Sequence, residues 1–286
     1  MRPPLTAHAG SSRATPGARR ASALGRPALY VAALGASGAA VLAGLGVASP
    51  LVPALALAAL RGVVGIGVGV PGSGVFARVV VGARTSMPLV ALTFDDGPDP
   101  TWTPRVLDAL ERAGHRATFF VVGERAAAHP ALVAECARRG HEVANHSWRH
   151  SYATPFAAPR ALAAELSRAS DAIAAATGAR PRWFRPPVGL LSPRVVRAAA
   201  LAGLELVGWT ATARDGTAAA TVDGALARLG PALAPGAILV LHDAVLRGNR
   251  SPIALAVLDA LLPRLDAAGL TSVTLSELVD GPRAVD

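Results

Sequence analysis

The sequence predicts an α/β fold whose parallel sheet is long enough to curl into a barrel, preceded by an apolar membrane-targeting segment. Two observations predict it. From residue 88 onward, short apolar runs typical of buried strands alternate with longer runs typical of helices, and strict alternation favours a parallel sheet. Before residue 77 the chain is instead apolar or basic. Its 286 residues are enough for one large domain and such an appendage.

The expected elements follow one another in order along the chain. Residues 89–94 are apolar except for Thr93, which is typical of a buried strand, and a helix is expected next at 104–113. A strand at 117–122, a helix at 131–139, a strand at 142–145 and a long amphipathic helix at 159–177 come after it. Further strands are expected at 183–184, 204–209, 238–241 and 271–274, with helices at 193–202 and 253–268.

The chain divides into three segments. Residues 1–26 are rich in Ala, Pro, Ser, Gly and Arg and are expected to be a disordered basic leader. Residues 27–76 form an apolar signal-anchor or transmembrane region, in which the uncharged stretch 28–49 is long enough to span a bilayer. A second apolar run continues to Val70 and is interrupted by Arg61. The α/β domain is expected at residues 85–286.

The apolar region has several interpretations. The first is a signal-anchor helix with its basic side in the cytoplasm, which would place the following domain outside the cytoplasm. The second is a cleaved signal peptide, which would release the domain by secretion. A two-helix hairpin is the third, although Arg61 and several glycines weaken the second span. A buried core helix of a soluble protein is the fourth.

The net charge of +9 does not indicate nucleic-acid binding, because of where the charge lies. No Asp or Glu precedes Asp95, whereas eight of the 28 basic residues do, and all of these are arginines. The remaining 20 arginines nearly balance the 19 acidic residues. The basic excess belongs to the N-terminal part, where it fits the positive-inside rule, so no nucleic acid is expected as a partner.

Polar residues gather just past the carboxyl ends of the expected strands. In parallel α/β barrels this rim is where catalytic residues lie, while the opposite rim serves stability. Five such clusters are difficult to explain by packing alone. Their members are Asp95 and Asp96 after the first strand, His146 and His150 after the third, Arg185 after the fourth, Asp215 beyond the fifth, and His242 after the sixth.

Each cluster by itself has a simpler interpretation. The segment 95–98 could be an ordinary turn, since Asp, Gly and Pro favour turns. His146 and His150 are four residues apart and could reach one metal ion, but such a pair is weak evidence in a chain with seven histidines. Arg185 could be a surface arginine, and His242 could be a core histidine with satisfied hydrogen bonds. Their joint placement at one rim favours a shared site.

Together these residue types fit metal-assisted hydrolysis of an amide or an ester. Two histidines and one carboxylate form a zinc-type site that leaves a position open for water, and the metal lowers the pKa of that water to about 7. A second carboxylate can take the proton of the water as general base, and an arginine beside it would keep it ionised and oriented. A histidine held by a carboxylate can protonate the leaving group.

Five motifs occur in a fixed order over about residues 88–280. They are TFDDGP at 93–98, HSWRH at 146–150, RPPVG at 185–189, the segment 209–215 and LVLHD at 239–243. In these motifs the chain resembles the NodB-homology polysaccharide deacetylases, which are carbohydrate esterase family four. The resemblance implies a distorted (β/α)7-type barrel as the fold.

The resemblance also implies a role for each residue of the site. Asp95 would be the catalytic base, oriented by Arg185, and His242 would be the general acid, tuned by Asp215. One divalent metal ion would be the cofactor: zinc, with cobalt or nickel also suited to such ligands. Its ligands would be Asp96, His146 and His150. The residues expected to contact the substrate are Pro187, Val188, whose backbone N–H would bind the oxyanion, and Trp209.

Two positions depart from the family's pattern. The family usually carries an aromatic residue where Val188 stands, and a tryptophan where Gly216 follows Asp215. The backbone donor of residue 188 survives the first change, whereas a sugar-stacking wall is lost. Both changes open the groove, so the resemblance leaves the identity of the substrate open.

The function implied is removal of N-acetyl groups from amino-sugar units of a cell-envelope polysaccharide, peptidoglycan or a similar glycan. One alternative keeps the hydrolase and changes the substrate to a lipid-linked amino sugar or to O-acetyl esters on glycans. Another is a non-catalytic, membrane-anchored glycan-binding protein. The expected partners are a glycan and, through residues 27–76, a membrane, with the catalytic domain outside the cytoplasm.

Overall fold

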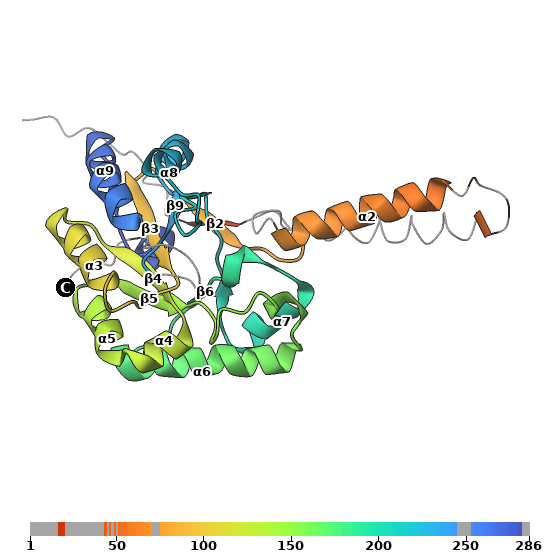
Figure 1. Ribbon diagram of the computed structural model, residues 1–286, viewed down its shortest axis with the longest axis horizontal. Helices are drawn as coiled ribbons and strands as arrows, with labels where there is room; N and C mark the ends of the chain where they lie inside the picture. The colour runs from red at the N-terminus through yellow and green to blue at the C-terminus, as the bar shows by residue number, and fades with distance from the viewer. Residues whose placement is uncertain are drawn as a thin grey trace, which may run out of the picture.

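The computed structural model describes residues 17–20, 43, 44, 46, 49, 51–69, 75–244 and 253–281. Its main body is an α/β half-barrel of parallel strands, flanked by helices (Figure 1). The expected membrane span at 28–49 lies outside the described residues except for positions 43, 44, 46 and 49. Of the expected disordered leader, only residues 17–20 are described.

The central sheet is parallel throughout. Its strands are β3 (Leu89–Asp95), β4 (Ala117–Val121), β5 (Glu142–Asn145), β6 (Trp183–Phe184), β7 (Glu205–Leu206), β8 (Ala211–Thr212) and β9 (Ile238–His242). They are ordered β7-β6-β5-β4-β3-β9-β8, and β10 (Thr271–Ser272) also pairs with β3. Strand β3 is buried along nearly its whole length between β4 and β9, which explains why its sequence is largely apolar.

The helices pack on the strands through their apolar faces. They are α3 (Thr103–Arg112), α4 (Gly123–Ala128), α5 (Pro130–Arg138), α6 (Pro159–Thr177), α7 (Pro193–Leu201), α8 (Val222–Leu229), α9 (Ala254–Ala267) and α10 (Leu275–Asp280). Proline occurs in the first turn of α3, α5, α6 and α7, where its missing N–H is not needed. The largest core cluster includes Leu92, Phe94, Leu107, Phe119 and Leu258, each fully buried or 1 % exposed. Burial of such a side chain contributes about 2 kcal/mol.

A strand before the expected domain start, called the seam strand below, lies between the segment after β7 and the segment before β9. Strand β2 (Val80–Arg84) bridges Val207, just after β7, and Ala237, just before β9. It also pairs antiparallel with β1 (Gly17–Arg20). Val79, Val80 and Ala83 are buried in the core, so the folded unit includes residues that precede position 85.

Helix α2 (Leu51–Gly69) extends away from the half-barrel (Figure 1). Val63 packs against a core cluster that contains Val75 and Phe76. Leu55 and Ile66 are 70 % and 53 % exposed. Within the described part of the chain, no helix combines the length and the apolar character needed to cross a bilayer. The transmembrane helix predicted in residues 27–76 is therefore not found among the described helices.

Each expected strand and helix of the α/β domain is present, and most begin and end within one residue of the prediction. The strand expected at 204–209 is shorter, because the chain leaves the sheet after Leu206. The N–H of Gly208 donates to the carbonyl of Val80 at 2.8 Å, so this segment bonds to the seam strand β2 instead. The strand expected at 271–274 ends at Ser272, and Thr274 caps helix α10.

Candidate active site

The carboxyl ends of four strands bring the predicted residues to one rim. Asp95 ends β3 and is paired with His242, which ends β9. His146 follows β5 and Arg185 follows β6, and these strands are paired at Asn145 and Phe184. Because parallel strands in register end at the same level, these side chains meet above the core.

Asp96, His146 and His150 form a compact cluster. The Oδ1 atom of Asp96 is 3.4 Å from Nε2 of His146 and 3.1 Å from Nε2 of His150. One ligand atom from each residue lies within 4.8 Å of the others. Both carboxylate oxygens of Asp96 are buried, and neither accepts a hydrogen bond from the described residues. A buried carboxylate in this state costs free energy, and a divalent cation is the partner that fits these three ligands.

The side-chain hydrogen bond of His146 uses Nδ1 and leaves Nε2 available to a cation. Its Nδ1 atom lies 2.7 Å from the carbonyl oxygen of Arg185. Since a carbonyl oxygen only accepts, Nδ1 carries the proton and Nε2 presents its lone pair. The chain thus selects the tautomer that can bind a metal.

The loop that carries both histidines is fixed by Asn145. Its side-chain oxygen accepts from the N–H of Ser147 at 2.8 Å, and its Nδ2 donates to the carbonyl of Leu166 and to Ser170. The N–H of His150 donates to Oγ of Ser147 at 3.1 Å. These contacts hold an otherwise unfavourable backbone, with φ of 67° at Ser147 and 51° at His150.

The cluster has the protonation state that cation binding needs. Burial acts to raise the pKa of Asp96, but the nearby imidazole of His146, together with those of His242 and His150, lowers it to about 2. Burial, followed by the charge of His146, lowers the pKa of His150. An ionised carboxylate and a neutral imidazole can bind a divalent ion without first losing protons.

Arg185 holds Asp95 from beneath the rim. The Nη1 atom of this fully buried arginine donates to Oδ1 of Asp95 at 2.6 Å and to Oγ1 of Thr93 at 2.8 Å, and Nη2 donates to the carbonyl of Gly208. Its guanidinium carbon lies 4.1 Å from the centre of the Phe120 ring. This charge-assisted bond fixes the position of the carboxylate, as a general base requires.

His242 and Asp215 form a second, partly buried pair. Oδ1 of Asp215 is 2.8 Å from Nδ1 of His242, and Oδ2 accepts from the backbone N–H of His242 at 2.9 Å. Burial opposes protonation, but the hydrogen bond and charge of Asp215, with Asp96 and Asp95, raise the pKa of His242 to about 9. The imidazole is therefore protonated at neutral pH, and its 21 % exposure leaves it accessible to a substrate.

The three residues expected to contact the substrate differ in exposure. In the 3-10 turn η3 (Pro187–Gly189), Pro187 is buried, whereas Val188 is 54 % exposed and has a φ of 56°. Trp209 is half-buried, and its ring centre is 5.9 Å from the guanidinium carbon of Arg185. Among these three, Val188 offers the largest exposed fraction to a ligand.

Two buried residues support the site although the sequence assigned them no role. Thr93 accepts from Arg185 and donates to the carbonyl of Leu239. Asp243 lies against Gly97, where an added Cβ would be 2.5 Å from Oδ2 of Asp243, and it accepts from Thr103. Both stand inside the motifs TFDDGP and LVLHD, which is the signal that could have pointed to them.

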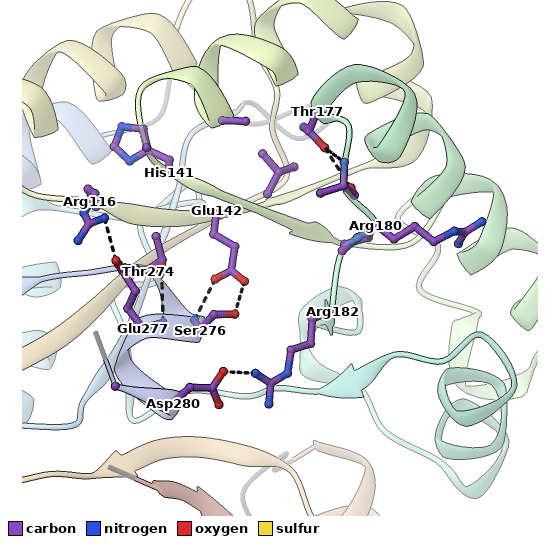
Figure 2. Close-up of a pocket in the computed structure, with 16 residues that line it drawn as sticks. Arg116, His141, Glu142, Thr177, Arg180, Arg182, Thr274, Ser276, Glu277 and Asp280 are labelled. Atoms are coloured by element: carbon purple, nitrogen blue, oxygen red, sulfur yellow. Dashed lines mark hydrogen bonds and ion pairs between the residues drawn. The ribbon is translucent and has the colours of Figure 1, made fainter. Parts of the chain in front are cut away.

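A groove of about 470 Å³ lies apart from the predicted site residues (Figure 2). It is near the amino ends of β5 and β6, and Glu142 and Arg182 line it. Its charges largely pair with one another, as in Arg116 with Glu277 at 2.8 Å and Arg182 with Asp280 at 2.6 Å. None of the residues predicted for catalysis or metal binding lines it.

Comparison with known proteins agrees with this geometry. The family model described as polysaccharide deacetylase matches residues 82–207. A peptidoglycan-N-acetylglucosamine deacetylase of Bacillus cereus is 35% identical over 193 residues, which cover 67% of this chain and 88% of that protein. A chitooligosaccharide deacetylase of Sinorhizobium fredii is 39% identical over 172 residues, covering 59% of this chain and 78% of that protein.

A solved structure is similar over the same region. The family 4 acetyl xylan esterase of Clostridium thermocellum, in complex with a cobalt ion, is 34% identical with a TM-score of 0.61. The match covers 66% of this chain and 89% of that one. The motifs, the half-barrel and these relatives agree: the chain belongs to the polysaccharide deacetylase family, the NodB-homology family of carbohydrate esterases.

Proposed function

We propose that this deacetylase is a metal-dependent hydrolase that removes N-acetyl groups from amino-sugar units of a cell-envelope polysaccharide, such as peptidoglycan. The observation that carries the proposal is the cluster of Asp96, His146 and His150 at the same rim as two ion pairs, Asp95 with Arg185 and His242 with Asp215. Relatives named as deacetylases of peptidoglycan and of chitooligosaccharides support the amino-sugar substrate.

The three clustered side chains would hold the cation through two imidazole nitrogens and one carboxylate. When bound there, a divalent ion supplies Lewis acidity and lowers the pKa of water. Zinc is our first choice, and cobalt and nickel suit the same ligands. Residues Asp96 and His150 are already in the ionised and neutral forms that such binding requires.

Asp95 and His242 would divide the proton transfers of the hydrolysis. Asp95, held by Arg185, accepts a proton from the attacking water as the water oxygen bonds to the acetyl carbon. His242, protonated at neutral pH, donates a proton to the sugar nitrogen as the carbon–nitrogen bond breaks. The products are acetate and the free amine. The backbone N–H of Val188 would stabilise the negative charge on the acetyl oxygen.

Acetate release tests this proposal. The purified chain, supplied with zinc, should release acetate from N-acetylated glycan, and Asp95→Asn and His146→Ala should each lower the rate at least about a hundredfold. Release that is unchanged in both variants would show that the proposed residues do not carry the reaction.

A second candidate is hydrolysis of O-acetyl esters on glycans. It is favoured by the similar structure, whose printed name is acetyl xylan esterase. The same base and acid would serve an ester, since an alkoxide leaving group also accepts a proton. Rates on an O-acetylated xylan and on N-acetylated glucosamine oligomers, measured with one preparation, would discriminate between the two. A lipid-linked amino sugar is a further substrate for the same comparison, because the exposed apolar side chains of α2 could contact lipid.

We further propose that residues 27–76 anchor the protein in a membrane, with the hydrolase domain outside the cytoplasm. The uncharged stretch 28–49 and the basic residues before it support this location. Secretion after signal cleavage is the alternative. Protease accessibility of the domain in intact cells, together with the mass of the mature chain, separates these two outcomes from a cytoplasmic location.

A further inference from the structure

We propose that the ring of Tyr152 is a stacking surface for a sugar unit of the glycan, directly beside the candidate metal cluster. This inference rests on the proposed function, and it gives a role to a residue outside the motifs that identify the family. It also bears on which sugar unit of a glycan chain lies beside the cluster.

Tyr152 is one of few large apolar side chains that the domain leaves open to solvent. Over the described residues 75–244 and 253–281, those with high exposure are Phe156 at 76 %, Tyr152 at 63 %, Val188 at 54 % and Leu201 at 49 %. The two aromatic ones lie in the segment that directly follows His150. Of the two, Tyr152 is the one whose ring lies against a residue of the candidate metal cluster, so it is the one placed to contact a ligand there.

The ring of Tyr152 stands next to the cluster. Its centre is 5.7 Å from the centre of the His150 ring, and the two rings are perpendicular. The His150 ring is in turn 5.0 Å from that of His146. A sugar whose acetamido group reached Asp96 would therefore bring its own ring, or that of the neighbouring unit, within reach of Tyr152.

The segment that carries Tyr152 is held in place. The hydroxyl of Thr154 donates to the carbonyl of Ser151 at 2.6 Å. Ser192 donates to the carbonyl of Pro155 at 2.8 Å, and Arg194 donates to that of Phe156 at 2.7 Å. Thr154 and Pro155 are buried. Because this segment is bonded to residues just beyond η3, little ordering is needed on binding, which favours affinity.

The chemistry of the ring fits a sugar. A pyranose presents a flat face of C–H groups that packs on an aromatic ring, while its hydroxyls stay hydrated. Tyrosine combines an apolar body with a polar tip, so it suits such an amphipathic ligand. Val188, an exposed side chain in the motif that follows β6, offers no aromatic face. Tyr152 thus supplies a stacking surface that position 188 lacks.

The test measures binding without turnover. The full-length, zinc-loaded chain carrying Asp95→Asn would be titrated calorimetrically with the pentamer of N-acetylglucosamine, alone and combined with Tyr152→Ala, Tyr152→Phe or Phe156→Ala. We expect Tyr152→Ala to raise the dissociation constant about tenfold, since an aromatic contact of this kind changes affinity by up to about tenfold. Tyr152→Phe keeps the ring and should bind like its parent.

Phe156→Ala is the matched control, because it removes an exposed aromatic side chain from the same segment. It should bind like the parent, and zinc content should be equal in all variants, which excludes an effect through His150. Equal binding by Tyr152→Ala and its parent, or the same loss in Phe156→Ala, would overturn the inference. Absence of acetate release by the unmutated chain would instead count against the proposed function, so the two failures are distinguishable.

Discussion

Nδ1 of His146 donates a hydrogen bond of 2.7 Å to the carbonyl oxygen of Arg185, the residue whose side chain holds Asp95. Arg185 thus orients the candidate metal ligand His146 through its backbone carbonyl and the candidate base Asp95 through its guanidinium. The metal cluster and the base are therefore coupled through the residue that follows β6, and a substitution of Arg185 should affect both.

Loss of the Arg185 side chain should destabilise the fold and remove activity. Arg185→Met leaves the carboxylate of Asp95 without its buried partner, and breaking such a pair costs about 3 kcal/mol or more. Acetate release should fall at least about a hundredfold, because the base is no longer oriented. Arg182→Met removes two more exposed ion pairs, with Glu205 and with Asp280, and should cost less than about 1 kcal/mol. Chemical denaturation of both variants checks this, and equal losses would contradict it.

The raised pKa of His242 should appear in the pH dependence of stability. Its folded value of about 9 lies above the ordinary 6.5. A group whose pKa folding raises adds stability that is complete below 6.5 and is lost as the pH rises through about 9. The unfolding free energy of the metal-free chain should therefore fall over this window relative to that of His242→Gln.

An NMR titration of the His242 imidazole in the metal-free chain measures the same effect directly. Asp215→Asn should bring the pKa of His242 down toward 6.5, because it removes the charge that holds the proton. A pKa close to 6.5 in the unmutated chain would argue against His242 as an acid that is protonated at neutral pH.

Gly97 should not tolerate even a methyl group. A Cβ there would lie 2.5 Å from Oδ2 of Asp243, which is buried, so the segment beside Asp96 must shift. Gly97→Ala should lower zinc affinity and the melting temperature. Gly230→Ala is the control, since nothing lies within 4 Å of its added Cβ and its φ is an ordinary −50°. Equal zinc affinity in the two variants would mean that Asp243 does not constrain the position of the segment that carries Asp96.

Asn145 should control metal affinity without touching the ion. Asn145→Ala removes three hydrogen bonds that fix the turn before His150 and should cost about 2 kcal/mol of stability. Zinc affinity should fall about tenfold to a hundredfold, as for other groups that orient metal ligands. Competition with a fluorescent chelator measures it, and unchanged affinity would exclude this role for Asn145.

The sequence predicted the elements of the sheet well, because buried parallel strands such as 89–94 are largely apolar and their helices are amphipathic. The rim placement of Asp95, His146, Arg185 and His242 followed from the same pattern. Other elements escaped for physical reasons. Strand β8 has only two residues, α4 only six, and β2 is held by contacts with residues far along the chain.

The supporting contacts of the site could not be predicted from local pattern. That Thr93 bridges Arg185 to Leu239, or that Asp243 lies against Gly97, depends on the strand pairing in space. The exposure of Tyr152 beside His150 is likewise a tertiary property. The transmembrane helix, by contrast, was predicted from hydropathy alone, and the described helices contain none of sufficient length and apolar character.

Metal content tests the central claim most directly. After equilibrium dialysis against zinc, the unmutated chain should hold one ion per chain, His150→Ala should hold far less, and His129→Ala, which changes a histidine outside the cluster, should match the unmutated chain. Equal zinc content in the unmutated chain and in His150→Ala would contradict the assignment of Asp96, His146 and His150 as the ligands of a single cation.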